Sequence, residues 1–158
     1  MIRNYEDKDL SLIMDIADRA WQKIYDMYLD AYGKGLFEIL VPDRNSSKGE
    51  QIKNHCGKYP EWIFICEENK RVVGFVTFFL DYEKRIGEIG NNAVGPDAGL
   101  KGIGQQMYKA VLKHFTEEGM TYAKVATGLD DAHAPARRAY ERAGFDIKVE
   151  DVTYYKKL

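Results

Sequence analysis

The sequence predicts a mixed α/β fold, in which a central mixed sheet carries helices on its faces. From residue 61 onward, segments with strand and helix patterns follow the order β-β-β-α-β-α-β-β, and the residues before them are mainly helical. The chain has 158 residues, 45% of them hydrophobic, which is enough apolar surface to build a globular core. No internal repeat or low-complexity linker divides it. We therefore expect a single domain that spans residues 1–158.

The first third of the chain is expected to be largely helical. A helix that opens at Ser11 is supported by apolar residues that recur near a 3.6-residue period: Leu12, Ile13, Ile16, Ala17, Ala20 and Trp21. The other elements expected here are a strand from Ile2 to Tyr5, a helical or loop-like stretch from Tyr25 to Tyr32 interrupted by Gly33 and Gly35, and a helix from Ser47 to His55 ended by Gly57.

The rest of the chain is expected to supply most of the sheet. The expected strands are Trp62 to Cys66, Val72 to Leu80, Ile86 to Val94, Tyr122 to Thr127, Phe145 to Val149 and Val152 to Tyr155. Between them lie two helices, one marked by Ile103, Met107, Ala110, Val111 and Phe115 and closed by Gly119, the other marked by Ala136, Ala139, Tyr140 and Ala143 between Pro135 and Gly144. Gly87 and Gly90 interrupt the third strand and suggest a bulge or a close approach there.

Charge and cysteine usage exclude several classes of function. The 23 basic and 25 acidic residues give a net charge of −2, which disfavours bulk attraction to nucleic acid or to an anionic membrane. Neither a signal peptide nor a membrane-spanning stretch is recognised. Cys56 and Cys66 fit no disulfide or metal motif, and the three histidines have no ligand spacing, so we expect no metal and a cytoplasmic protein.

A glycine-rich turn after the third strand is the most informative segment. Gly99, Gly102 and Gly104 lie where the strand ending at Val94 gives way to a helix, and Lys101 adds a positive charge. The free N–H groups and the dipole of a helix N-terminus favour an anion, and glycines let a phosphate approach the backbone. The segment matches neither the Walker pattern nor the full dinucleotide pattern. It predicts a phosphate site, against the alternative of a glycine-rich helix entry that serves packing alone.

Two stretches of this sequence resemble motifs of the GCN5-related N-acetyltransferase (GNAT) superfamily. Val94-x-Pro96 followed by Lys101-Gly102-Ile103-Gly104 is similar to its acyl-CoA-binding signature, and the stretch from Ala136 to Phe145 is similar to its second motif, which ends in Tyr-Glu-x-x-Gly-Phe. The resemblance extends from about Trp62 to Gly144. It implies a mixed, mostly antiparallel sheet that is splayed at the fourth strand and flanked by about four helices, with acetyl-CoA in the cleft.

The resemblance also implies which residues hold acetyl-CoA. The backbone of Ala93 and Val94 would pair with the pantetheine arm, and the amides from Leu100 to Gly104, a stretch that contains Lys101, Gly102 and Ile103, would hold the diphosphate. The sequence departs from the family pattern at Gly99, where Gln or Arg is usual, and at His133, where Asn is frequent. His133 is expected to touch the pantetheine arm or to lie exposed at a helix entry. Arg137 is expected to reach a phosphate of the cofactor or to be a solvated charge.

Acetyl transfer to an amine needs a deprotonated amine and a proton for the departing thiolate. The resemblance places Tyr140 near the sulfur as the general acid, against the alternative that it only packs in the core. Glu88 is the only carboxylate in the third strand and is the candidate base, directly or through water, against an exposed or ion-paired role. Strand parity puts Glu88 and Asn92 on one face unless a bulge intervenes.

The aromatic first third is expected to select the substrate. Tyr25, Tyr32 and Asn92 are candidate contacts for a small-molecule or peptide amine, whereas Trp21 is interpreted as a core residue. The leading hypothesis is direct transfer of acetyl from acetyl-CoA to a primary amine. The alternatives are protein or peptide N-acetylation, or a catalytically idle acyl-CoA-binding or regulatory module. The composition is compatible with a homodimer.

Overall fold

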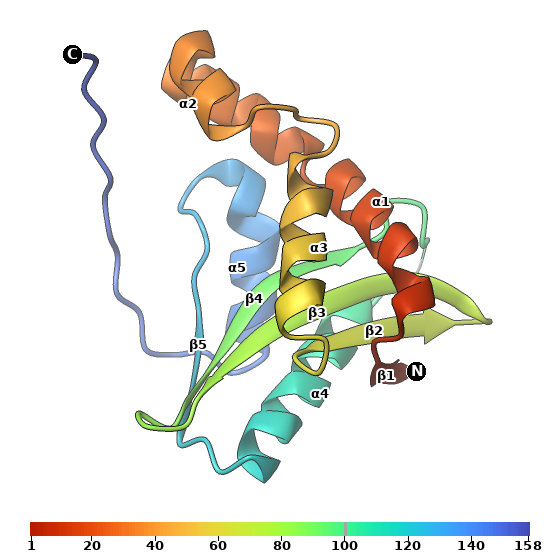
Figure 1. Ribbon diagram of the computed structural model, residues 1–158. Helices are drawn as coiled ribbons and strands as arrows, with labels where there is room; N and C mark the ends of the chain where they lie inside the picture. Colours follow the sequence, from red (N-terminus) through yellow and green to blue (C-terminus); the bar gives the residue numbers. More distant parts are fainter. Residues whose placement is uncertain (100) are drawn as a thin grey trace.

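The computed structural model describes residues 1–99 and 101–158 and confirms the mixed α/β class. Five strands form one open sheet in the order β1-β2-β3-β4-β5 (Figure 1). The strands are β1 (Ile2–Asn4), β2 (Ile63–Glu68), β3 (Arg71–Asp81), β4 (Ile86–Val94) and β5 (Tyr122–Val125). Every neighbouring pair is antiparallel except β4 and β5, which run parallel.

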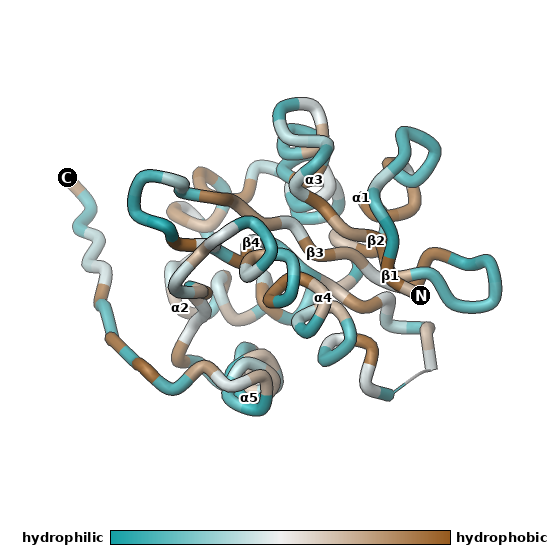
Figure 2. The backbone as a smooth tube through the Cα atoms, turned by 90° about the horizontal axis from the view of Figure 1, so that it is seen from below, coloured by the Kyte–Doolittle hydropathy of each residue, from teal (hydrophilic) through white to brown (hydrophobic). Residues whose placement is uncertain are grey.

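Helices cover both faces of this sheet (Figures 1 and 2). The helices are η1 (Asp7–Asp9), α1 (Leu10–Ala20), α2 (Gln22–Leu40), α3 (Ser47–Lys58), α4 (Ile103–Glu117), η2 (Asp131–His133) and α5 (Ala134–Arg142). On one face, α1 and α3 pack on side chains such as Ile65 and Phe75. On the other face, α4 and α5 pack on neighbours such as Val76 and Phe78. Because strand side chains alternate between faces, the apolar residues of β3 serve both cores.

The sheet opens at the end of β4. Only Ile86 to Ile89 pair with β5, so Gly90 to Val94 have a free edge on that side within the part of the chain that the structure describes. The register with β3 also shifts between Val76 and Phe78, which marks a bulge in this stretch of β4. A Cβ at Gly90 would lie 2.6 Å from Thr77 Oγ1, so this position requires a glycine. The splayed fourth strand that the resemblance implied is therefore confirmed.

The bulge changes which side chains share a face. Asn92 contacts α4 and α5, whereas its neighbour Asn91 contacts Lys48 of α3. Glu88 is the cross-strand partner of Phe79, whose ring contacts His55 of α3. Glu88 therefore lies on the face of Asn91, and the simple strand parity that grouped it with Asn92 does not hold.

Two expected strands and one helix end are wrong. Residues 144–158 contain no strand, and the apolar side chains of Ile147, Val149 and Val152 are 79%, 84% and 72% exposed. Figures 1 and 2 show this tail running clear of the sheet, and an apolar alternation becomes a strand only beside a pairing partner. Gly57 lies inside α3, not at its end. Gly33 does break the helical geometry of α2, with φ of 73°, but helix resumes up to Leu40.

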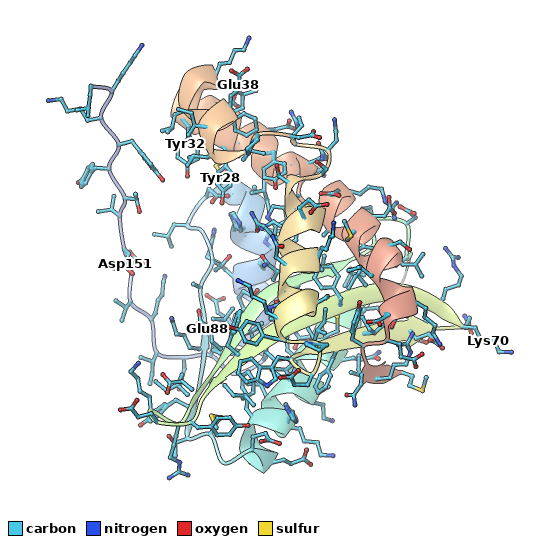
Figure 3. All side chains as sticks on the ribbon, viewed as in Figure 1. Tyr28, Tyr32, Glu38, Lys70, Glu88 and Asp151 are labelled. Carbon is cyan, nitrogen blue, oxygen red and sulfur yellow. The ribbon has the colours of Figure 1, made fainter. Side chains whose placement is uncertain are left out.

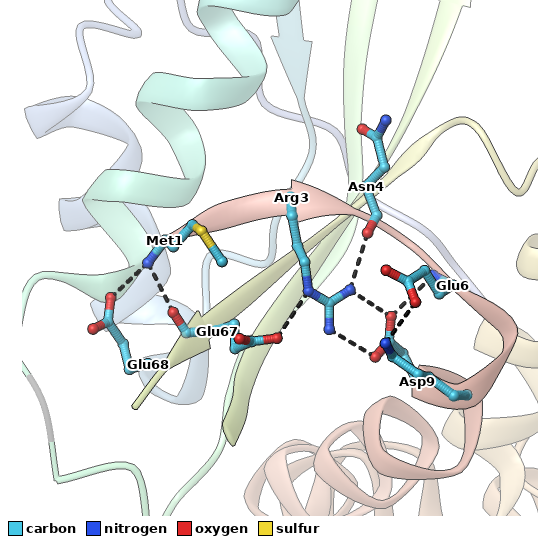
Figure 4. Close-up of polar contacts among 8 residues, drawn as sticks. Met1, Arg3, Asn4, Glu6, Asp9, Glu67 and Glu68 are labelled. Carbon is cyan, nitrogen blue, oxygen red and sulfur yellow. Dashed lines mark hydrogen bonds and ion pairs between the residues drawn. The ribbon is translucent and has the colours of Figure 1, made fainter. Parts of the chain in front are cut away.

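An ionic cluster fixes the first strand (Figure 4). Arg3 donates to both carboxylate oxygens of Asp9, at 2.7 and 2.8 Å, and to Glu67 at 2.9 Å. These bonds tie β1 to β2 and to the turn before α1. The Arg3 guanidinium holds the pKa of the buried Asp9 carboxyl below its ordinary value.

Candidate active site

A pocket of about 240 Å³ lies where β4 separates from β5. Its walls come from four parts of the chain: the junction of α1 and α2, the free edge of β4, the end of β5, and the start of α5. The lining residues are Ala20, Trp21, Ile24, Gly90, Asn91, Asn92, Ala93, Val94, Thr127, Ala132, His133, Pro135, Ala136 and Tyr140. The predicted site residues Asn92, Ala93, Val94, His133 and Tyr140 are thus brought together in one place.

The free edge of β4 offers backbone hydrogen-bonding groups to this pocket. Gly95 N–H donates to Val73 O at 2.8 Å, so the backbone of Gly95 faces β3. In an antiparallel ladder the facing direction alternates along the strand, which turns the backbone groups of Asn92 and Val94 away from β3 and toward the open edge. An extended molecule with amide groups can pair there as an added strand would.

Two tyrosines and one asparagine form a hydrogen-bonded chain beside the pocket. Tyr108 O–H donates to Asn92 Oδ1 at 2.8 Å, and Asn92 Nδ2 donates to the Tyr140 hydroxyl oxygen at 3.0 Å. The same amide nitrogen donates to Gly90 O at 3.1 Å, which fixes the orientation of the amide. Because Tyr140 accepts in this chain, its own O–H proton is left for a group in the pocket. Burial raises the pKa of Tyr108, so this phenol stays neutral and keeps donating.

His133 lines the pocket and is oriented by a carboxylate. Its Nδ1 lies 2.7 Å from Asp130 Oδ2, and its backbone N–H bonds Asp130 Oδ1. Burial acts to raise the pKa of Asp130, but the bonds from His133 outweigh it, and the net shift is downward. In the tautomer that donates Nδ1–H to this carboxylate, the acceptor of the ring is Nε2.

Arg137 holds the loop that precedes α5. One guanidinium nitrogen, Nη1, donates to Gly128 O and to Asp130 O, both at 2.6 Å. This pairing fastens the end of β5 to the α5 N-terminus. Arg137 is not part of the pocket lining.

The glycine turn forms the N-terminus of α4, as expected. Gly102 is the N-cap residue, with φ of 84°, a left-handed conformation that glycine adopts without strain. Gln106 N–H donates to Gly102 O as the first bond of the helix, so the amides of Ile103 and Gly104 point outward. Lys101 is exposed beside them. Leu100, also predicted to contact the cofactor, lies outside the described residues.

The structure does not bring every predicted residue into the pocket. Glu88 forms an exposed ion pair with Lys124 at 3.0 Å and does not line the pocket. Tyr25 is buried against Phe37 in a small cluster of α2, where burial raises its pKa to about 12. The Tyr32 ring packs tilted against Tyr28 and edge-to-face with Tyr155. Figure 3 shows Tyr32 on α2, well separated from Glu88.

Three residues at the site were not anticipated as functional. Tyr108 follows Met107 in the sequence and belongs to no recognised motif, so nothing distinguished it from the other residues of this helix. Trp21, interpreted as core, forms part of the pocket wall. Lys48 is 8% exposed and contacts both Trp21 and Asn91. Within residues 1–99 and 101–158, no group of three or more metal-ligating side chains occurs, and no helix is long and apolar enough to cross a bilayer.

Comparison with known proteins agrees with this geometry. A model of the acetyltransferase (GNAT) family matches residues 21–145. The chain belongs to the GNAT acetyltransferase family. The match includes every pocket-lining residue except Ala20, as well as the glycine turn and the helix that carries Tyr140.

Individual acetyltransferases resemble the chain in sequence or in fold. It is 30% identical over 116 residues to mycothiol acetyltransferase of Streptomyces bingchenggensis (strain BCW-1), covering 72% of this chain but only 37% of that relative. The PaiA N-acetyltransferase of Thermoplasma acidophilum, solved in complex with coenzyme A, has a TM-score of 0.74 at 16% identity and covers 96% of this chain and 92% of its own. A GNAT acetyltransferase of Brucella melitensis, solved with acetyl-CoA, has a TM-score of 0.63 at 20% identity, with coverages of 93% and 82%.

Proposed function

We propose that this protein transfers the acetyl group of acetyl-CoA directly to a primary amine. The observation that carries the proposal is the pocket at the free edge of β4. One of its walls offers backbone hydrogen-bonding groups, and another carries the Tyr140 hydroxyl, whose proton is free to be donated. Family membership and the neighbours solved with coenzyme A and acetyl-CoA support the choice of cosubstrate.

The residues present fit acetyl-CoA as a ligand. Its pantetheine arm is an extended chain with amide groups, suited to the outward backbone of Asn92 and Val94 along the Ala93–Val94 edge. With Nδ1 held by Asp130, the Nε2 atom of His133 would accept one of its amide N–H groups. The diphosphate would bind at the α4 N-terminus, where the amides of Gly102, Ile103 and Gly104 and the charge of Lys101 favour an anion. Arg137 supports the pocket wall that carries His133, because it holds the loop before α5.

Tyr140 is the proposed general acid. In the transfer, the C–N bond forms as the C–S bond breaks, the amine loses a proton, and the thiolate gains one. The bond from Asn92 Nδ2 occupies a lone pair of the Tyr140 hydroxyl and leaves its proton for the sulfur. Tyr108 completes this arrangement by holding the Asn92 amide in place.

Glu88 is the proposed base, acting through a water molecule. It is the only carboxylate of β4, and it lies on the face of the sheet that carries Asn91 and α3. Its Oε2 is bonded to Lys124, which leaves Oε1 for a water that relays the amine proton. The buried free thiols of Cys56 and Cys66 support a cytoplasmic location, and neither lies in the pocket, so no acyl-cysteine step is proposed.

A thiol-release assay tests this function. The protein is mixed with acetyl-CoA and a panel of small amines, amino sugars and short peptides, and free coenzyme A is followed together with the acetylated product by mass. We expect turnover with at least one amine class. Tight binding of acetyl-CoA without turnover across the whole panel would favour an idle acyl-CoA-binding module instead.

A further inference from the structure

One cation in the interior is not used by the proposed reaction. Lys48 lies in the first turn of α3 and is 8% exposed. Its Nζ donates to Gln51 Oε1 at 2.8 Å and to Asn91 Oδ1 at 3.2 Å, and lies 4.3 Å from the centre of the Trp21 ring. All three partners are neutral.

Among the described residues, no carboxylate lies within ion-pair distance of this ammonium group. Asp18 of α1 faces the same turn, but its Oδ1 accepts from the Gly49 N–H instead. Glu88 of β4 pairs with Lys124, and Glu50 of α3 pairs with Lys53 at the surface. Burial without a counter-charge lowers the pKa of Lys48 to about 8. A buried cation in such surroundings destabilises a fold unless an anion compensates it.

The position of this cation links it to the pocket. Two of its three partners, Trp21 and Asn91, line the pocket, so the ammonium lies directly behind that wall. Since Asn91 Oδ1 accepts from Lys48, the amide presents its Nδ2 hydrogens on the other side, and within the described chain they have no acceptor. On the opposite face of β4, by contrast, the Asn92 amide is fully bonded.

We propose that Lys48, Asn91 and Trp21 form an anion subsite for the acceptor, so that the amine substrate also carries a carboxylate or another anionic oxygen group. This inference rests on the proposed function, because it describes the acceptor side of the same pocket. The Asn91 amide donates to an anionic oxygen of the acceptor, and the charge of Lys48 attracts that oxygen through or beside the amide. The acceptor approaches from the α1–α3 face while the Tyr140 side receives the cofactor.

Matched acceptor pairs test the subsite. The rate of thiol release is measured for glycine, β-alanine and 4-aminobutyrate, each against its own carboxamide, with acetyl-CoA saturating. For the best acid we expect kcat/KM at least tenfold above that of its amide. Lys48→Met should reduce this ratio to nearly one, Lys48→Arg should keep most of it, and Lys53→Met, an exposed lysine of the same helix, should leave it unchanged.

Direct binding separates this inference from the proposed function. Calorimetry at pH 8 measures binding of the same acids to the protein loaded with coenzyme A, in two buffers of different ionisation enthalpy. An anion beside Lys48 favours its charged form, so wild-type protein should take up protons on binding and Lys48→Met should not. This measurement requires no turnover, and the wild-type arm requires no variant to fold.

The kinetic and binding results together distinguish failure of the subsite from failure of the proposed function. Lys48-dependent binding in a protein that acetylates no amine would overturn the proposed function and keep the subsite. Turnover with equal preference for acids and amides, or an acid preference that survives in folded Lys48→Met, would overturn the subsite and keep the function. Absence of acid binding and of turnover together would overturn both.

Discussion

Asn91 and Asn92 are neighbours with the same side chain, yet they belong to opposite sides of β4. Asn92 has three hydrogen bonds, to Gly90 and to two buried tyrosines, and is held in a single orientation. Asn91 has one long bond from an ammonium group and an amide that faces the pocket. On the α4–α5 side, the Asn92 amide is thus held before any ligand arrives and the Tyr140 proton is left to donate. On the α1–α3 side, the Asn91 amide keeps its hydrogens for a partner.

This difference assigns the two sides to different tasks. A network that holds its reacting group in one orientation suits chemistry, because that group needs no reorganisation. Donors that have no partner within the chain suit recognition of a variable substrate. Substitutions on the first side should therefore change the rate of transfer. Apart from Glu88, the proposed base, substitutions on the second side should change which acceptor is used.

After removal of the Tyr140 hydroxyl, which is the last test below, the largest effect is expected at Asn92. Asn92→Ala removes the link between the tyrosines and leaves the buried Tyr108 hydroxyl without its acceptor, a loss of about 1–3 kcal/mol in stability. We expect kcat to fall about tenfold, equivalent to about 1.4 kcal/mol of barrier. Asn91→Ala is the matched control, and it should raise the acceptor KM with little change in kcat. Equal kinetic effects of the two substitutions would remove the distinction between the sides.

A smaller effect is expected at the cofactor end. Gly102→Ala places a side chain at φ of 84°, where the left-handed strain is about 1–2 kcal/mol, although nothing lies within 4 Å of the new Cβ. We expect weaker binding of coenzyme A by calorimetry, together with a lower melting temperature. Gly119→Ala is the matched control, because it has φ of 78° at the other end of the same helix. Gly119→Ala should lose as much stability as Gly102→Ala but bind coenzyme A as tightly as the wild type.

The smallest effect concerns pH. Burial lowers the pKa of His55 in α3, and its Nε2 lies 2.9 Å from Trp62 O. The unfolded chain therefore binds a proton at a higher pH than the folded one, so His55 contributes stability that is present above about pH 6.5 and is lost as the pH falls toward its folded pKa. Urea unfolding between pH 7.5 and 5 should show a shallower decline in His55→Gln. If the free energy of unfolding fell with pH equally in wild type and His55→Gln, the lowered pKa of His55 would not contribute to the acid sensitivity.

Local signals predicted the parts of the site that depend on neighbours in sequence. The glycine turn, the helix caps at Gly119 and Gly144, and the strand at Ile86 to Val94 lie where the patterns put them. Motif resemblance added Tyr140, which no periodicity distinguishes from a core aromatic residue. The structure places it in the pocket at 7% exposure.

Properties that depend on pairing could not be predicted in this way. The bulge at Gly90 arises from the register with β3, and it alone decides that Glu88 shares a face with Asn91 and not with Asn92. The burial of Lys48 depends on α1, α3 and β4 meeting, since an isolated helix would present this side chain to solvent. The tail after Gly144 has a strand pattern but no strand beside it, so the pattern predicted two strands that are absent.

The central claim, that Tyr140 donates the proton on the α4–α5 side of β4, is tested most directly by single-turnover kinetics. Acetyl transfer is measured with enzyme in excess over acetyl-CoA for Tyr140→Phe and for Tyr82→Phe, an exposed tyrosine remote from the pocket. The account predicts that Tyr140→Phe slows the chemical step about 100-fold or more with unchanged binding of coenzyme A, while Tyr82→Phe matches wild type. A Tyr140→Phe rate within twofold of wild type, with chemistry limiting, would contradict it.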